Sequence, residues 1–321
     1  MATIFNSTDC TTNRKNTGFS DCFADITSIL GFFIVPSSFN LDADDLVSKA
    51  TALAALQAAA LSDTKGSRIY PVHQLKNPAD SSEDTTKQTF SDGSQAVVRE
   101  GLMMWDFQVT SGGLCLHKSL RTHNQNGGYI IFYDANFTLY GWAKNAGEIW
   151  GVPLNFLWTK PWKMNDGSNV TAYMVGMAFA PRYVNEAIGY AKMDSTLEAI
   201  TGIQDVVLTE VAFDDETGVA EVSALLECGA TNMAEIYGAE LDVAGAWVAE
   251  NALTGETITI DAVSVIGGID PRFQITFDVD DPHYPASGTI LLSMAALSVL
   301  EALRVEGFES NELELVTTSS S

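Results

Sequence analysis

Positive charge is scarce in this sequence. The 321 residues include 17 Lys and Arg against 41 Asp and Glu, which gives a formal net charge of −24. Nonspecific binding to a phosphate backbone needs clustered Lys and Arg that release counterions. The composition therefore argues against a protein that wraps nucleic acid. An acidic wall would still let nucleic acid pass without sticking, because like charges repel.

Cysteine is also scarce. The four cysteines show no CxxC pair and no metal-ligand spacing: Cys10, Cys22, Cys115 and Cys228. Four thiols in a chain of this length do not make the disulfide framework of a small secreted domain. We expect ordinary buried or free thiols.

Long apolar runs are absent. The best one, Ile26 to Val35, is closed by Pro36 and is too short to span a bilayer. Met1 to Lys15 lacks the charged region and apolar run of an export signal. The sequence predicts a protein made in the cytoplasm, with no membrane partner.

Catalytic motifs are missing as well. The chain has no GxSxG elbow, P-loop, HExxH motif or kinase signature. His117 and His123 are six residues apart, which does not place both on one helix face for a shared metal. Cys115 and His117, two apart, point to different faces of a helix. The sequence therefore predicts a protein that is not an enzyme and has no cofactor.

One acid-rich turn has the oxygen ligands that Ca²⁺ prefers. It contains Asp278, Asp280 and Asp281, and Asp214 to Glu216 could add ligands to the same site at one end of a sandwich. Acidic turns are usually just solvated, and no EF-hand loop is present. We therefore predict no metal site, with calcium at Asp278, Asp280 and Asp281 as the alternative.

What the sequence does contain is mostly strand-like. Met1 to Gly18 is polar and predicts an extended arm, and Ser20 can cap a short helix toward Leu30. An Ala- and Leu-rich segment predicts a helix over 42–61. From Arg68 onward the pattern predicts strands, with an amphipathic helix over 113–125.

Two hairpins stand out among these strands. Asp92-Gly93 is a hairpin turn signal between KQTF and QAVVRE. The aromatic runs on either side of Asp134 to Asn136 predict the second hairpin, and Asn169 to Pro181 predicts a further long strand.

The acidic charge is concentrated in the C-terminal part. From Ala199 onward there are 22 Asp and Glu but only two basic residues, Arg272 and Arg304, whereas residues 1–198 hold 19 acidic and 15 basic residues. Such a break marks a domain boundary, with Tyr190 to Gly202 as the linker or a short joining helix. Strand candidates then recur at the spacing of a sandwich, at 205–214, 218–227, 240–250, 256–266, 272–280, 288–297 and 312–316.

Tryptophan is concentrated in the N-terminal part. Trp158 and Trp162 flank Lys160 and Pro161 in LWTKPWK. A packed loop or an interface anchor is favoured over a sugar-binding platform, because aromatic residues are enriched at interfaces.

The segment from about Arg68 to Pro181 resembles the tube-forming β-sandwich of tailed-bacteriophage tail tube proteins and related neck or ring proteins. The resemblance rests on its long strands, the hairpin arm from Glu83 to Arg99 and the helix over 113–125. Residues 203–318, especially GTILLSMAALSVLEALRVEGFES before the last strand, are similar to the immunoglobulin-like domain that these proteins often carry at the C-terminus. That family has no signature motif, so no functional residue carries over.

Together these features predict a mainly β protein: a tube-type β-sandwich with flanking helices, followed by an immunoglobulin-like β-sandwich. The expected parts are an N-terminal arm and short helix over 1–40, an assembly domain over 41–198 and an acidic immunoglobulin-like domain over 199–321.

The resemblance implies a virion protein that forms hexameric rings or a tube with itself. It also implies contacts with other virion proteins, and DNA only as passing cargo. The candidate interface residues are Glu83, Asp92, Gly93, Arg99, Trp158 and Trp162. A major capsid or decoration protein is one alternative. A virion-borne module that binds a carbohydrate or receptor through the Trp142 to Trp162 segment is another.

Overall fold

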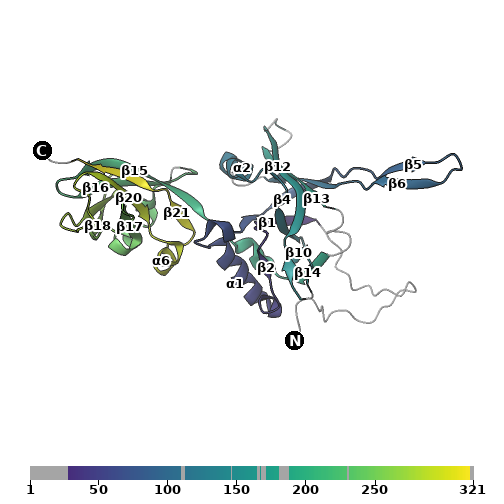
Figure 1. Cartoon of the computed structure of the whole chain (residues 1–321), viewed down its shortest axis with the longest axis horizontal. Coiled ribbons are helices and arrows are strands. Elements are labelled where there is room, and N and C mark those ends of the chain that lie inside the picture. The colour runs from purple at the N-terminus through teal and green to yellow at the C-terminus, as the bar shows by residue number, and fades with distance from the viewer. Residues whose placement is uncertain are drawn as a thin grey trace. The chain divides into compact units, whose positions relative to one another are not determined.

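The computed structural model describes residues 28–109, 113–145, 147–164, 167, 171–180, 188–229 and 231–318 (Figure 1). The protein is mainly β and contains several sheets. It divides into two compact units, Met1–Gly202 and Ile203–Ser321. The expected arm before Gly18 and most of the helix from Ser20 lie outside the described residues.

Within the described part of unit 1, twelve strands join in one sheet whose pairings are antiparallel. Its main path runs β2-β11-β10-β9-β12-β13-β7-β4. The path strands are β2 (Asn40–Leu41), β11 (Ile149–Trp150), β10 (Thr138–Trp142), β9 (Tyr129–Asp134), β12 (Val152–Lys163), β13 (Ala172–Phe179), β7 (Met103–Val109) and β4 (Leu75–Asp80). Off this path lie β1 (Ile29–Val35), β3 (Tyr70–Val72), β8 (Gln125–Asn126) and β14 (Ile188–Lys192).

The helix expected to run toward Leu30 is wrong at its end, because Ile29 and Leu30 belong to strand β1. It pairs with β9 and β3, and its side chains enter two different cores. Phe32 and Ile34 join one apolar cluster, whereas Phe33 and Val35 join another. A strand covered on both faces is apolar throughout, so its sequence lacks the alternation that would have identified it.

Helix α1 (Lys49–Ala60) covers one of these cores. It starts later than the predicted 42–61 helix, because Ser48 caps it and forms a capping box with Thr51, while Asp45–Val47 forms a separate 3-10 turn, η1. Its small buried face, Ala52, Leu56 and Ala60, packs into the core that also contains Phe33. Helix α2 (Gly113–Thr122) ends three residues before the predicted limit and contributes Leu120 to the other core.

The segment expected to be a linker is part of unit 1. Residues Ile188–Lys192 form β14 on the edge of β10, and Ser195–Ala199 forms the 3-10 helix η3. Leu197 and Ile200 are buried. His73 also holds this segment, because its ring nitrogens lie 2.8 Å from the Ile200 carbonyl oxygen and 2.7 Å from the Tyr133 hydroxyl.

Unit 2 places two sheets around one core. The order of the larger sheet is β18-β19-β16-β15-β21, and that of the smaller is β17-β20-β22. The larger contains β15 (Gln204–Asp214), β16 (Val219–Leu226), β18 (Ile260–Ile266), β19 (Arg272–Phe277) and β21 (Phe308–Ser310). The smaller contains β17 (Trp247–Asn251), β20 (Gly288–Met294) and β22 (Leu313–Thr317).

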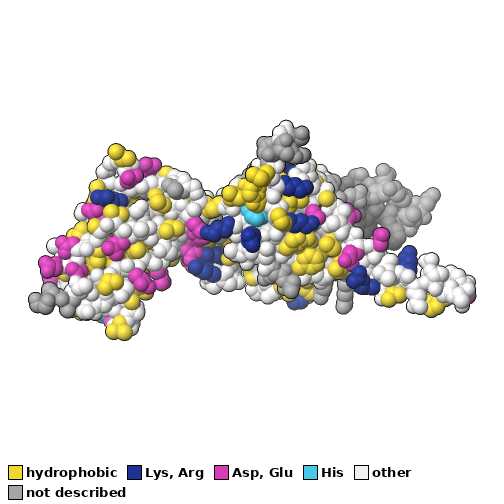
Figure 2. Space-filling model, turned by 90° about the horizontal axis from the view of Figure 1, so that it is seen from above, with side chains coloured by type: hydrophobic (Ala, Val, Ile, Leu, Met, Phe, Trp, Pro, Cys, Tyr) yellow, Lys and Arg dark blue, Asp and Glu magenta, His cyan; other side chains and the backbone are white. Residues whose placement is uncertain are grey.

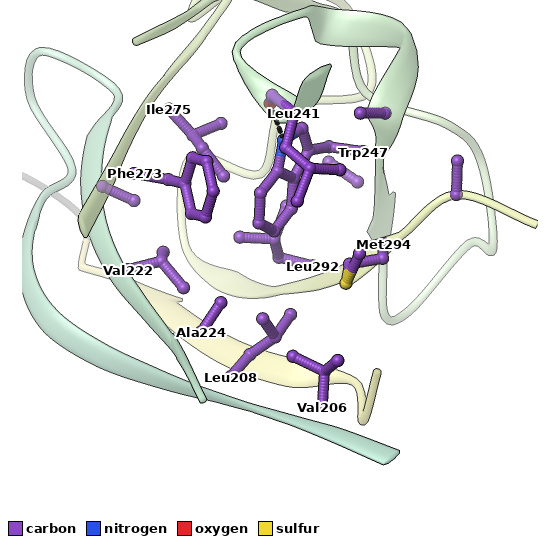
Figure 3. Close-up of a cluster of buried hydrophobic side chains, with 14 of the residues drawn as sticks. Val206, Leu208, Val222, Ala224, Leu241, Trp247, Phe273, Ile275, Leu292 and Met294 are labelled. Atoms are coloured by element: carbon purple, nitrogen blue, oxygen red, sulfur yellow. Dashed lines mark hydrogen bonds between the residues drawn. The ribbon is translucent and has the colours of Figure 1, made fainter. Parts of the chain in front are cut away.

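Side chains from both sheets meet in this core (Figure 3). Val222 and Phe273 come from the larger sheet, and Leu292 and Trp247 from the smaller. The expected strand over 240–250 is wrong in its first half, where α5 (Gly238–Leu241) and η4 (Ala244–Ala246) precede β17. Further short helices are α4 (Met233–Ile236) and α6 (Leu297–Ala302).

Trp247 links α5 to the core of unit 2. Its buried indole N–H donates to the Leu241 carbonyl at 2.9 Å. We expect Trp247→Phe to lower the free energy of unfolding of unit 2 by about 1–3 kcal/mol, because the Leu241 carbonyl is left unpaired. Differential scanning calorimetry measures this. Leu253→Ala is the control, since Leu253 is 93% exposed and should cost under about 0.5 kcal/mol. Equal stability of the two variants would contradict the account.

His73 should make unit 1 sensitive to pH. Burial lowers its pKa, against smaller opposing effects of the Ile200 hydrogen bond and Glu198. As the pH falls below about 6.5, this histidine therefore takes up a proton in the unfolded chain before it does so in the folded one. The free energy of unfolding decreases from that pH down to the pKa of His73 in the folded protein.

Burial also lowers the pKa of His123, so both histidines contribute to this loss. Urea unfolding followed by tryptophan fluorescence at pH 7.5 and 5.5 should show a lower unfolding free energy at pH 5.5. His73→Gln should reduce that difference, and an undiminished difference would exclude His73 as a source.

Candidate assembly surface

A two-stranded arm leaves the sheet of unit 1. The ladder between β4 and β7 continues beyond both strands, with the Ser81 N–H donating to the Met104 carbonyl and the Glu83 N–H to the Leu102 carbonyl, each at 2.9 Å. It then becomes the hairpin of β5 (Thr86–Thr89) and β6 (Gln95–Arg99). Figure 1 shows this hairpin projecting from the body of the unit. Residues 83–99 are called the arm below.

The arm contains four of the predicted interface residues. Gly93 sits at its tip with a φ of +85°, which favours glycine, and the Asp92 carboxylate accepts the Ser94 N–H at 2.9 Å. Near its base, Arg99 pairs with Glu83 at 2.7 Å. Both partners of that pair are largely exposed, so it contributes little to stability.

The arm has no core of its own. Every residue from 81 to 100 is exposed except Ala96. Phe90, Val97 and Val98 are 46%, 60% and 63% exposed. Figure 2 shows hydrophobic and basic side chains along the arm, at the right of the view. An isolated two-stranded hairpin is marginally stable in water, so these apolar side chains favour contact with another surface.

A small apolar pocket lies at the root of the arm. Its volume is about 290 Å³, and it is lined by Ser28, Ile29, Pro78, Ala79, Asp80, Met103, Trp105 and Phe107. Hydrogen bonds from Ser82 lower the pKa of Asp80, so its carboxylate is ionised at neutral pH. This pocket could not be recognised from the sequence, because its lining residues come from β1, β4 and β7 and from Ser28 before β1.

The outer face of β7, β13 and β12 carries an aromatic cluster. Asp106, Gly176 and Trp158 are directly opposite one another across these strands. The Trp158 ring lies over Gly176, where an added Cβ would come within 2.3 Å of it. Lys160 donates to the Asp106 carboxylate at 2.6 Å and lies 5.3 Å from the Trp158 ring centre. The other Asp106 oxygen is buried and has no hydrogen-bond partner in the described structure.

Of the two roles expected for LWTKPWK, a packed loop or an interface anchor, the structure contradicts the packed loop. These residues belong to strand β12, and Trp158 packs on Phe156 with ring centres 4.4 Å apart. Trp162 is 40% exposed near the end of the strand. Trp142 and Trp150 pair with each other on β10 and β11, where Lys144 lies over both rings. The four tryptophans therefore lie on three strands, with Trp158 and Trp162 both on β12 and Trp142 opposite Trp150.

The calcium candidates serve as loop-stabilising acceptors. Asp281 accepts the N–H and hydroxyl of Thr259 at 2.9 and 2.6 Å and the His283 N–H at 2.8 Å, and these bonds lower its pKa to about 2. Asp278 accepts the Asp280 N–H at 2.9 Å. Among the described residues, no three potential metal-ligating side chains gather into one group.

The cysteines and helix histidines have structural partners. Cys115 and Cys228 are each disulfide-bonded, so the expectation of free thiols is wrong for both. Cys10 and Cys22 lie outside the described residues. His117 is hydrogen-bonded to the Lys160 carbonyl at 3.1 Å, and the His123 ring lies 4.4 Å from that of Tyr70.

Comparisons with known proteins give no family. No protein-family model matches the chain, and no curated protein matches it. In the described part of the chain, no helix has the length and apolar character needed to cross a membrane.

Gly176 is required for Trp158 to lie flat on the sheet. We expect Gly176→Ala to destabilise unit 1 by about 1–3 kcal/mol, because the new methyl group displaces the ring and crowds Asp106. Gly66→Ala is the matched control, since nothing lies within 4 Å of its added Cβ. Urea unfolding should show the control unchanged or up to about 1 kcal/mol more stable. A Gly176→Ala protein as stable as the control would contradict this packing.

Proposed function

We propose that this protein is a non-enzymatic structural protein of a tailed bacteriophage virion, which assembles with itself into rings or a tail tube or neck conduit for DNA. In this proposal unit 1 is the tube-type β-sandwich and unit 2 is the immunoglobulin-like sandwich. The assembly is hexameric and contacts other virion proteins, and DNA is passing cargo.

The observation that carries the proposal is the free-standing arm. Among the residues that the structure describes, its backbone beyond the root pairs only within the arm, and it exposes Phe90, Val97 and Val98. A protein that worked as a monomer would gain nothing from this ribbon and would risk aggregation through it. A second subunit that covers the arm removes both difficulties. Repeated head-to-tail pairing of this kind builds a closed ring when the rotation between copies closes, and an open filament when it does not.

The charge distribution supports a solubility role for unit 2. Residues 203–321 hold 22 acidic and two basic residues. Figure 2 shows acidic side chains spread over this unit, toward the left of the view. Such a strong negative field keeps the protein soluble and discourages lateral aggregation of assembled particles. The low overall positive charge also agrees with DNA that passes without sticking.

Removing the apolar side chains of the arm should abolish assembly. We expect the full-length protein to form hexameric rings or tubes. The triple variant Phe90→Ser, Val97→Ser, Val98→Ser should be a monomer with an unchanged melting temperature, since these side chains are exposed in the single copy. Size exclusion with light scattering and negative-stain electron microscopy check this.

Leu253→Ser with Ile269→Ser is the matched control, because these side chains of unit 2 are more than 90% exposed but lie outside the arm. The control should assemble like the unmodified protein. A wild-type protein that stays monomeric at high concentration would contradict the proposal. Trimers or closed shells would favour the capsid alternative instead.

A further inference from the structure

His73 joins three parts of unit 1. It lies between β3 and β4, and its ring meets the Phe33 ring of β1 edge-on, with ring centres 5.7 Å apart. Its Nδ1 atom lies 2.7 Å from the Tyr133 hydroxyl on β9, and its Nε2 atom lies 2.8 Å from the Ile200 carbonyl oxygen. This one side chain therefore connects the sheet to the segment that leads into unit 2.

These two contacts fix which nitrogen of the neutral ring carries the hydrogen. A carbonyl oxygen can only accept, so Nε2 must carry the hydrogen and donate it to Ile200. Nδ1 then has a free lone pair, and the Tyr133 hydroxyl donates to it. The neutral Nε2–H form of His73 satisfies both partners at once.

A protonated His73 does not fit the same site. Both of its nitrogens would be donors, so the Tyr133 oxygen would have to accept, and the hydroxyl hydrogen would lose its nitrogen partner. Tyr133 is fully buried, and its hydroxyl is packed against Gly31 with no room even for a methyl group there. Burial also raises the pKa of Tyr133, so the hydroxyl keeps its proton. A buried donor without a partner is costly, and the protonated ring is therefore driven toward water.

The charged group that acts on His73 from the held segment is Glu198 of η3. Burial lowers the pKa of His73, and the opposing effects of the Ile200 hydrogen bond and of the Glu198 charge are smaller. From the sheet side, β1 contributes the Phe33 ring and β9 the Tyr133 hydroxyl, both uncharged. The neutral ring is therefore the form that the folded segment holds at neutral pH.

The segment that His73 holds covers residues 194–202. Its first part is η3 with the buried Leu197, and Ile200 is buried as well. At its end, a Cβ added to Gly202 would lie 3.2 Å from Pro71 of β3, and unit 2 begins with the next residue. Because the segment is short, one hydrogen bond at Ile200 is a substantial part of its attachment to the sheet.

From this geometry we infer that His73 is a pH-sensitive latch on residues 194–202. The neutral ring holds the Ile200 carbonyl on the sheet. A proton that Nδ1 takes from water breaks the Tyr133 contact, the ring turns out to solvent, and the segment opens more often. The latch acts within one copy and does not depend on the proposed assembly.

NMR of the full-length protein, labelled with ¹⁵N at its histidines, tests the neutral form. At pH 7.5 the His73 signals should be those of a ring protonated at Nε2 and unprotonated at Nδ1. They are identified as the signals that disappear in His73→Gln. A His73 ring protonated at Nδ1 at this pH would overturn the latch, because that nitrogen could not accept from Tyr133.

Hydrogen–deuterium exchange at pH 7.5 and 5.5, corrected for the intrinsic effect of pH on exchange, measures the opening. The opening equilibrium of residues 194–202 should rise by up to about tenfold at pH 5.5, the limit for a histidine whose pKa is near 6.5 once exposed. Core amides of unit 2 should change far less. No rise in this segment would overturn the latch.

Low concentrations of urea distinguish a local opening from unfolding of the whole unit. The opening of residues 194–202 should be nearly independent of urea, since a local opening exposes little surface. An opening that rises steeply with urea would mean that unit 1 unfolds as a whole, and would overturn a local latch.

Three variants separate His73 from its surroundings. His73→Gln keeps a donor for Ile200 and should lose most of the pH dependence of the opening. His123→Gln, at a second partly buried histidine, is the matched control and should keep it. Glu198→Gln should give a rise at least as large as that of the wild type, because removing the charge lowers the pKa of His73 further. Equal pH dependence in His73→Gln and His123→Gln, or a smaller rise in Glu198→Gln, would overturn the assignment to His73.

Discussion

The antiparallel ladder between β4 and β7 starts inside unit 1 and runs on into solvent as the arm. Inside the unit, one face of β7 is covered by the apolar core, with Phe107 and Val109 fully buried. Beyond Met103 no core follows, so the same backbone pairing holds exposed Phe90, Val97 and Val98 without tertiary support. The pocket beside Trp105 forms where the core ends. The proposed contact of the arm with a second subunit depends on this one transition.

Features set by neighbouring residues could be predicted from the sequence. The Asp92-Gly93 turn and the Ala-rich α1 helix depend on turn chemistry and helix propensity, which act over a few residues. The β1 strand could not be recognised, because Ile29 to Val35 is apolar on both faces and carries no period. The segment around Ile200 resembled a linker, since its anchors, His73 and the core near Leu197, are distant in sequence.

On the candidate surface, too, features set by neighbouring residues could be predicted and features set by residues distant in sequence could not. The arm was accessible to sequence reasoning, whereas the pocket was not, because its walls come from β1, β4 and β7. Trp158 was recognised as a candidate, but its ring position depends on Gly176 of the neighbouring strand. In the sequence, the acidic turn at Asp278 to Asp281 offers the carboxylate oxygens that calcium prefers as ligands. In the structure, Thr259 and His283 occupy the Asp281 oxygens that a metal would need.

The most direct measurement of the central claim is hydrogen–deuterium exchange of the arm in the wild-type protein, compared between a dilute monomeric sample and an assembled one. We predict fast exchange of the amides in residues 86–99 in the monomer, because a ribbon without a core opens easily. After assembly, the same amides should be strongly protected, whereas exchange of the amides in the core of unit 2 should be unchanged. Equal exchange of the arm in both samples would contradict the claim that a second copy covers it.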